Sequence, residues 1–274
     1  MKGRTVHPRL LLLPVVAALA TGCRTGLNYA HPEAPRYAGG APSAARPARA
    51  ADTLRVVTFN IELGSQIDSA LVVLRTDPAA RGADIVLLQE MDEPGTARVA
   101  AALGMAYVYY PGSLRSSTRR DFGNAVLSRW PIVADAKLVL PHTGRLARTE
   151  RTATAATIRV GEVPVRMYSA HLGTLLQVGG GGRRDQLRAI LTDAAAHPRV
   201  ILAGDMNSGA VGRLAREQGY TWPTEKGPRT TKGGRFDHVF VRGLALPDSA
   251  AAGTILDPHH ASDHRPVWAV VILR

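Results

Sequence analysis

Polar side chains stand directly after several apolar runs that predict buried strands. The runs and the residues that close them are Val56-Val57-Thr58-Phe59 with Asn60, Ile85-Val86-Leu87-Leu88-Gln89 with Glu90, Val165-Arg166-Met167-Tyr168-Ser169-Ala170 with His171, and Val200-Ile201-Leu202-Ala203-Gly204 with Asp205. A polar group at the end of a buried strand is costly to desolvate unless it is hydrogen-bonded, ion-paired or bound to a metal. These strand ends therefore indicate one common site at an edge of a sheet core.

Taken singly, each of these residues also has an ordinary structural explanation. The alternatives are a turn residue at Asn60, a helix-start acid at Glu90, a hydrogen-bonded strand-end histidine at His171 and a helix cap at Asp205. The C-terminal part favours the common site, because Asp237 opens an apolar run and Ser262-Asp263-His264 precedes the last one. Segments far apart in the sequence thus carry groups that suit the same chemistry.

The order of these motifs resembles the endonuclease/exonuclease/phosphatase superfamily, as in a bacterial lipoprotein-type member. The resemblance covers 54–274 and rests on Thr58-Phe59-Asn60, Leu88-Gln89-Glu90, the run 123–132 that begins Gly123-Asn124, Ala170-His171-Leu172, Gly204-Asp205-Met206-Asn207 and Ser262-Asp263-His264-Arg265-Pro266-Val267. It implies an α+β fold of the DNase I type: a four-layer sandwich of two packed mixed β-sheets with flanking helices and the active site at one end.

The resemblance also implies a divalent-metal-dependent phosphoester hydrolase in which water attacks phosphorus. Carboxylate and amide oxygens suit Mg²⁺ or Mn²⁺, and the implied metal set is Asn60, Glu90 and Asp263, with Glu90 the first choice. The implied catalytic set is His171, Asp205, Asn207, Asp237 and His264. In it, Asp205 activates the water, Asn207 and the two histidines hold the phosphate, and Asp237 orients His264 and keeps it protonated. Candidate substrate contacts are Asn124, Arg119 and Arg151, although surface arginines are common in this arginine-rich chain.

The substrate stays open at this level, with nucleic acid or another phosphodiester as the first expectation. The formal net charge of +12 would attract polyanions, but only 5% of residues are aromatic, which gives little support to base stacking. The alternatives are a phospholipid or small-molecule phosphoesterase and a non-catalytic binding lipoprotein that retains the fold. The chain lacks the Trp-Cys-Asp-Arg type of ending of inositol polyphosphate phosphatases, which lowers that possibility.

The elements that must position these residues are mostly short strands. Val- and Ile-rich runs predict strands over 54–60, 84–89, 106–110, 123–128, 132–140, 152–160, 163–170, 199–204, 236–242 and 266–273. Helical spacing predicts helices over 67–76, 95–103, 183–196 and 210–218, and Gly179-Gly180-Gly181-Gly182 indicates a flexible loop. Several strand pairs are joined by turns too short for a parallel crossover, which favours mixed or antiparallel sheets.

The N-terminal segment reads as an export signal over 1–23. Lys2, Arg4 and Arg9 precede an apolar run over 10–20 that is too short to span a bilayer as a mature helix. Ala20-Thr21-Gly22-Cys23 resembles a lipobox, and Cys23 is the only cysteine, so we expect its acylation rather than an ordinary signal peptide with a chance cysteine. A disordered Pro/Ala-rich linker over 24–53 and a catalytic domain over 54–274 would follow. The expected protein is a monomer held to the membrane of the bacterial envelope by this lipid anchor, in the periplasm or at the cell surface, with a phosphate ester as its partner.

Overall fold

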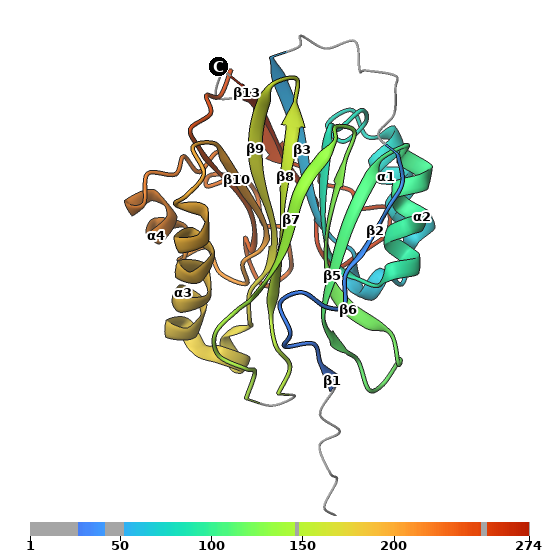
Figure 1. Cartoon of the computed structure of the whole chain (residues 1–274), viewed down its shortest axis with the longest axis vertical. Helices are drawn as coiled ribbons and strands as arrows, with labels where there is room; N and C mark the ends of the chain where they lie inside the picture. The colour runs from blue at the N-terminus through green and yellow to red at the C-terminus, as the bar shows by residue number, and fades with distance from the viewer. Residues whose placement is uncertain (1–26, 42–51, 146–147, 248–250, 274) are drawn as a thin grey trace, which may run out of the picture.

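The computed structural model describes residues 27–41, 52–145, 148–247 and 251–273 (Figure 1). The predicted signal peptide and the predicted acylation site Cys23 lie outside these ranges. Among the described helices, none is long and apolar enough to cross a membrane.

Two mixed β-sheets form the centre of the molecule (Figure 1). The first has the strand order β1-β5-β6-β4-β3-β13-β12, with β2 beside β5, and the second has the order β11-β10-β9-β8-β7. The strands of the first sheet are β1 (Leu27–Asn28), β2 (Tyr37–Gly39), β3 (Thr53–Asn60), β4 (Ile85–Met91), β5 (Ala106–Leu114), β6 (Asp121–Ser128), β12 (Ala252–Thr254) and β13 (Val267–Ile272). Those of the second are β7 (Ile132–Val139), β8 (Thr152–Val160), β9 (Val163–His171), β10 (Val200–Asp205) and β11 (Asp237–Arg242).

The helices complete four layers. The helices α1 (Ile67–Thr76) and α2 (Glu93–Leu103) pack their buried side chains on the outer face of the first sheet. The helices α3 (Leu175–Ala194) and α4 (Gly212–Glu217) cover the second sheet. Fully buried aliphatic side chains of both sheets, such as Val56 and Ile201, form the core between them. The predicted four-layer sandwich is thus confirmed.

Every strand and helix predicted from the sequence is present, most with shifted ends. The short strand β12 was not predicted. The Gly179–Gly182 run was expected to be a loop, and this is wrong, because these residues lie within the span of α3. A capping box between Thr174 and Gln177 starts that helix, and Gly179, at φ 72° and ψ 176°, then kinks it. Glycine tolerates this φ, so the helix continues past the kink.

The prediction of a disordered linker over 24–53 is wrong for residues 27–41. Strands β1 and β2 pair antiparallel with β5, and Tyr37 stacks on Tyr109 with ring centroids 6.0 Å apart. The Lys137 ammonium donates to the carbonyl oxygens of Tyr29 and Ala34 at 2.8 and 2.5 Å. Composition did not reveal this, because the segment is held by the open edge of a sheet rather than by a core of its own.

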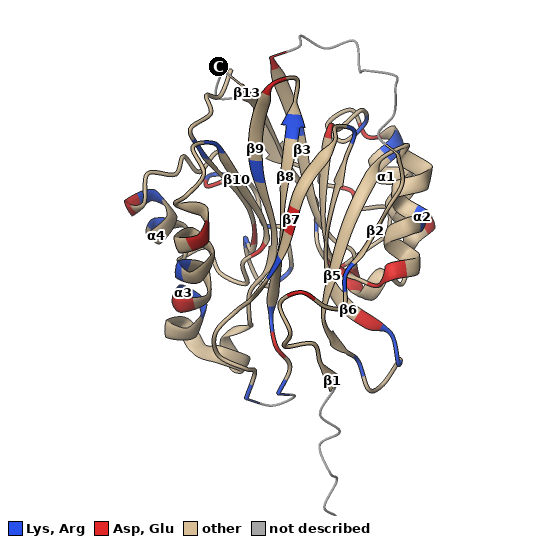
Figure 2. Ribbon diagram, viewed as in Figure 1, with Lys and Arg blue, Asp and Glu red and all other residues tan. Residues whose placement is uncertain are grey.

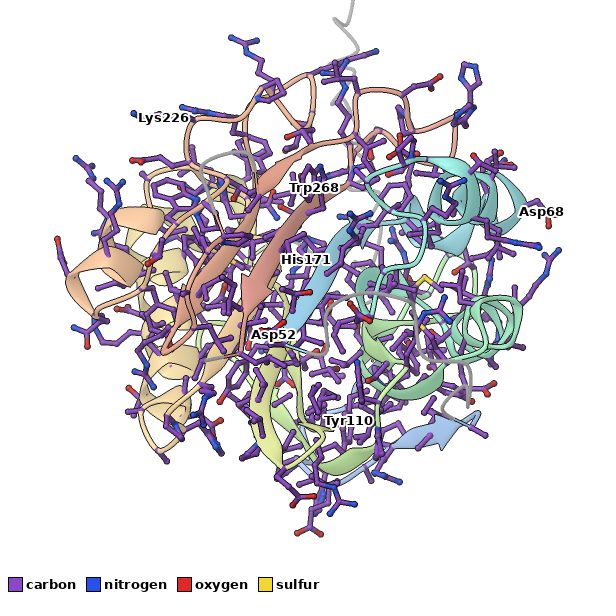
Figure 3. All side chains as sticks on the ribbon, turned by 90° about the horizontal axis from the view of Figure 1, so that it is seen from above. Asp52, Asp68, Tyr110, His171, Lys226 and Trp268 are labelled. Carbon is purple, nitrogen blue, oxygen red and sulfur yellow. The ribbon has the colours of Figure 1, made fainter. Side chains whose placement is uncertain are left out.

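The directions of the strands place the ends of many of them at one end of the sandwich. Strands β3 and β4 run parallel, as do β9 and β10, so their C-terminal residues meet there. Strands β8, β11 and β13 run antiparallel to these neighbours and therefore begin at the same end. Figure 3, viewed along the molecule from its opposite end, shows His171 near the centre, whereas Asp68 and Lys226 lie at the periphery.

Candidate active site

Strand register places three of the predicted catalytic residues side by side in the second sheet. Asp205 stands opposite His171 of parallel β9 and opposite Asp237 of antiparallel β11. The Asn60 side-chain amide reaches across from the first sheet and donates to Asp205 Oδ2 at 3.2 Å. The structure therefore brings together groups that are 145 positions apart in sequence.

The backbone before Asp205 requires glycine. Gly204 has φ 145°, and a Cβ atom there would lie 1.9 Å from the carbonyl oxygen of Ala170 on β9. Any side chain would push β10 away from β9 and break the register that sets Asp205 beside His171. The Gly-Asp motif thus has a structural cause in the close approach of two backbones.

The Asp205 carboxylate is buried and surrounded by polar groups. Its Oδ1 accepts from the backbone N–H of Asn207 at 2.8 Å, and its Oδ2 lies 3.3 Å from His171 Nε2 and 3.7 Å from His264 Nε2. Burial, followed by the charge of Asp237, raises the pKa of Asp205 to about 7, while His264 opposes the shift. A carboxyl group with this pKa can exchange a proton near neutral pH.

Asp237 and His264 form a close pair. His264 Nδ1 lies 2.8 Å from Asp237 Oδ2. Burial by itself would lower the pKa of His264, but the charge and hydrogen bond of Asp237 outweigh it and raise that pKa to about 10. His264 is therefore an imidazolium at neutral pH, as the predicted orienting role of Asp237 requires. Asp237 Oδ1 is buried without a hydrogen-bond partner among the described residues.

The charge of His171 is set by burial and by Arg151. The Arg151 guanidinium Nη1 lies 3.1 Å from each ring nitrogen of His171. Burial, with the charges of Arg151 and His264, lowers the pKa of His171 well below its usual value. His171 is thus neutral, and the positive charge on this side of the site belongs to Arg151. That guanidinium is held by Gln177 Oε1 at 2.9 Å and lies over the Phe122 ring at 5.3 Å.

Glu90 turns its carboxylate toward the same pocket. Its Oε1 accepts from Asn60 Nδ2 at 3.3 Å, and its Oε2 accepts from the backbone N–H of Leu63 at 3.2 Å. Its φ of 58° is unusual for glutamate, and such backbone strain is found often at functional sites. Asp263 lies at the rim, with its side chain 65% exposed and Oδ1 3.9 Å from His264 Nε2.

A pocket of about 410 Å³ opens beside these groups. Its lining includes Glu90, Arg151, Asp263 and His264 together with residues that the sequence did not single out, namely Glu62, Leu63, Ser113, Leu114, Arg115, Ser116, Ser117, Phe122, Thr149 and Gln177. The sequence offers a signal for Glu62, since it follows Asn60 by two positions. In the structure, the Glu62 carboxylate accepts a hydrogen bond from the backbone N–H of Asp263 at 3.1 Å.

Three of the predicted residues have other contacts than expected. The Asn207 side-chain amide donates to Leu172 O at 2.9 Å and to Asp205 Oδ2 at 3.3 Å, so its donors position the carboxylate. Asn124 is buried, does not line the pocket, and donates to the Thr152 carbonyl oxygen at 2.7 Å across the two sheets. Arg119 is exposed in the β5–β6 turn and also does not line the pocket.

The acidic groups of the site suit a cation. Ligand atoms of Asp205, Asp237 and His264 lie within 4.8 Å of one another. The imidazolium form of His264 has no free lone pair for a metal, so the carboxylates are the better donors. The raised pKa of Asp205 and the unpartnered Asp237 Oδ1 both indicate that additional positive charge would be favourable here.

Comparisons with known proteins agree with this fold. A family model described as the Endonuclease/Exonuclease/phosphatase family matches residues 57–264. No curated protein sequence matches the chain.

Solved structures that resemble the chain share its fold at low sequence identity. An endonuclease/exonuclease/phosphatase from Beutenbergia cavernae is 21% identical, with a TM-score of 0.67 over 81% of this chain and 72% of that one. The D. rerio TDP2 structure with a single-strand DNA product is 19% identical, with a TM-score of 0.62 over 80% of this chain and 98% of that one. The human Nocturnin catalytic domain with bound sulfate is 18% identical, with a TM-score of 0.60 over 87% of this chain and 98% of that one.

Proposed function

We propose that this chain, which belongs to the endonuclease/exonuclease/phosphatase family, hydrolyses phosphoester bonds, most readily phosphodiesters, with the help of a divalent cation. The observation that carries the proposal is a buried carboxylate, Asp205, 3.7 Å from His264, which pairs with Asp237 and lines an open pocket. A general base and a positively charged hydrogen-bond donor within 4 Å of each other suit attack by water on a phosphate.

The donor set fits Mg²⁺ or Mn²⁺. Glu90 is our first choice of ligand because its carboxylate lines the pocket, and Asn60 holds it in place. Asp263 at the rim is a further oxygen donor that a second ion or a metal-bound water could use. Oxygen ligands in this number, with water completing the shell, are what Mg²⁺ prefers. Bound there, the cation would polarise a phosphoryl oxygen and stabilise the leaving oxygen.

Side chains of the site carry out proton transfer and hold the phosphate. Asp205 takes a proton from the attacking water, whose oxygen bonds to phosphorus as the bond to the leaving oxygen breaks, and the leaving oxygen takes a proton from solvent. Asn207 and Asn60 hold the Asp205 carboxylate in place through hydrogen bonds. His264 and Arg151 donate to the phosphate oxygens, where negative charge accumulates. Neutral His171 can donate one hydrogen bond and adds no charge.

A second candidate is a binding lipoprotein that retains the fold without turnover. The intact Asp237–His264 pair and the proton affinity of Asp205 favour catalysis, since neither is needed to bind a phosphate passively. Nucleic acid is one substrate to test, because the TDP2 neighbour is described with a DNA product.

The test is hydrolysis of bis-p-nitrophenyl phosphate by the purified chain with Mg²⁺, Mn²⁺ or Ca²⁺. We expect Glu90→Ala and His264→Ala to reduce turnover at least about a thousandfold, because each removes a group acting on the reacting phosphate. EDTA should abolish turnover, and added metal should restore it. Val133→Ser, on the exposed surface of β7, is the matched control and should behave as the unmodified chain. Undiminished turnover in either active-site variant would refute the assignment.

A further inference from the structure

The N-terminal strand joins the sheet at the end that carries the pocket. Leu27 and Asn28 of β1 pair with Leu114 and Ser113 of β5, and both of these β5 residues line the pocket. The Asn28 side chain also donates to the carbonyl oxygen of Arg148 at 2.6 Å. The chain therefore leaves the described domain beside the mouth of the pocket, at the bottom of Figure 1.

This exit point limits how far the pocket can lie from the predicted acylation site. Cys23 precedes Leu27 by four positions, and an extended chain covers at most about 3.6 Å per residue, or about 14 Å in all. If Cys23 carries the lipid, Leu27 lies no further than that from the point where the chain enters the bilayer, and Leu27 pairs with Leu114 of the pocket lining. The Pro/Ala-rich stretch that follows β2 cannot extend the tether, because β1 and β2 are already fixed to β5.

Large apolar side chains are exposed around the same mouth. Leu27 is 60% exposed, and Leu175 and Leu176, at the start of α3, are 60% and 76% exposed. Both α3 leucines directly precede Gln177, which lines the pocket and holds Arg151. Leucines left mostly exposed in the first turn of a helix beside a polar pocket suit the interface of a membrane.

Arginines surround these leucines. Arg115 and Arg119 lie in the β5–β6 turn, and Arg145 and Arg148 in the β7–β8 connection, where Figure 2 shows basic positions at the lower end of the molecule. Arg119, Arg145 and Arg148 are exposed; of the acids at this end, Asp121 and Glu150 are half-buried, and Glu62 and Asp263 in the pocket lining are exposed. The Asp121 carboxylate also accepts from the Tyr29 hydroxyl at 2.9 Å, which keeps it turned toward the protein.

We propose that the pocket end of this protein is a membrane-docking face that rests on an anionic phospholipid bilayer, so that the phosphoester it hydrolyses belongs to a lipid headgroup. The proposal rests on the proposed hydrolase function for its second part. Exposed leucines enter the headgroup region, the arginines meet anionic phosphates, and the short tether holds the face against the surface. A nucleic acid would use the arginines but would gain nothing from the leucines.

The docking part can be tested in the full acylated chain reconstituted into vesicles of phosphatidylcholine with phosphatidylglycerol. An environment-sensitive fluorophore is attached at Leu176→Cys or, as the matched control, at Val133→Cys on exposed β7. Spin-labelled lipids should quench the probe at 176 at least about threefold more than the probe at 133. The double variant Arg145→Glu/Arg148→Glu should show less quenching at 176 in anionic vesicles, because each lost arginine lowers the affinity of this face for the anionic surface about fivefold. Arg159→Glu should leave the quenching at 176 unchanged. Equal quenching at 176 and 133 would overturn the docking face.

The same samples test the tether and the substrate. Acylated Cys23 cannot react with the fluorophore, so labelling of the chain without an introduced cysteine would overturn the tether. Loss of intact phosphatidylglycerol, followed by mass spectrometry, should be faster in wild type than in the Arg145→Glu/Arg148→Glu variant, while both hydrolyse bis-p-nitrophenyl phosphate equally. A chain that cuts the soluble ester or plasmid DNA but leaves the lipid intact would overturn the lipid substrate. A chain inactive on every substrate would contradict the hydrolase itself, and the quenching result would still decide the docking.

Discussion

Replacing Asp237 by asparagine should remove the proton that His264 holds at neutral pH. Asn keeps the size of the side chain and can still accept a hydrogen bond from His264 Nδ1, which lies 2.8 Å away. The substitution removes the negative charge that offsets the effect of burial on the pKa of His264. With that charge gone, burial is opposed only by the weaker effects of Asp205 and Asp263, and the pKa of His264 falls from about 10 toward the ordinary histidine value.

The magnitude follows from this shift. A complete fall from about 10 to the ordinary histidine value of about 6.5 would correspond to roughly 5 kcal/mol of lost preference for the charged form. At pH 7.5 the charged fraction of His264 then falls from nearly all molecules to about a tenth. A charge-assisted hydrogen bond to phosphate exceeds a neutral one by about 1–2 kcal/mol. We therefore expect Asp237→Asn to lower kcat/KM about 10- to 100-fold at pH 7.5.

The assay is the ratio of variant to wild-type kcat/KM for bis-p-nitrophenyl phosphate between pH 6 and pH 8.5. The ratio should rise toward low pH, where His264 of the variant regains its proton, and the weaker repulsion on Asp205 acts in the same direction. Imidazole NMR of the metal-free protein reports the His264 pKa directly. A His264 pKa that stays near 10 in the variant, or a ratio independent of pH at full activity, would refute the reasoning.

Three further predictions concern other parts of the structure. Arg151→Met should raise KM for phosphoesters about tenfold, since its buried guanidinium lines the pocket 3.1 Å from His171. Arg151→Lys should recover part of the loss, and an unchanged KM would contradict a substrate contact. Gly204→Ala should lower the unfolding free energy, measured in urea, by about 3 kcal/mol or more, because the added Cβ would lie 1.9 Å from the carbonyl oxygen of Ala170. Gly161 also has a positive φ but has open space around it, so Gly161→Ala should cost only about 1 kcal/mol. Buried His238 packs against Trp222, and burial lowers its pKa to about 4. The folded-state pKa of His238 lies below the unfolded value of 6.5, so neutral His238 contributes its full share of the unfolding free energy above pH 6.5. As the pH falls toward 4, roughly 3 kcal/mol of this stability is lost. Thermal unfolding of His238→Gln should therefore depend less on pH over this window, and equal slopes for the two proteins would count against the assignment.

The sequence by itself determined the strands and the residues that close them. Short Val- and Ile-rich apolar runs are local signals, so the strand that ends at Asn60 and the one that ends at Asp205 were predicted within a residue or two. The motif order was sufficient to identify the family and, through it, the fold. The family resemblance also implied the pairing of Asp237 with His264, whose Nδ1 lies 2.8 Å from Asp237 Oδ2 in the structure.

Only the tertiary structure decided the charge of His171 and the contacts of the sheet edge at β5. The neutral state of His171 depends on its burial and on the guanidinium of Arg151, which lies 20 positions earlier in the chain. Likewise, the ordering of residues 27–41 depends on an open edge of β5 that no local composition reveals. Burial, electrostatic neighbours and edge pairing are properties of the packed chain, because each depends on which distant segments come into contact. Local patterns therefore predicted which residues meet, and packing determined what each of them can do there.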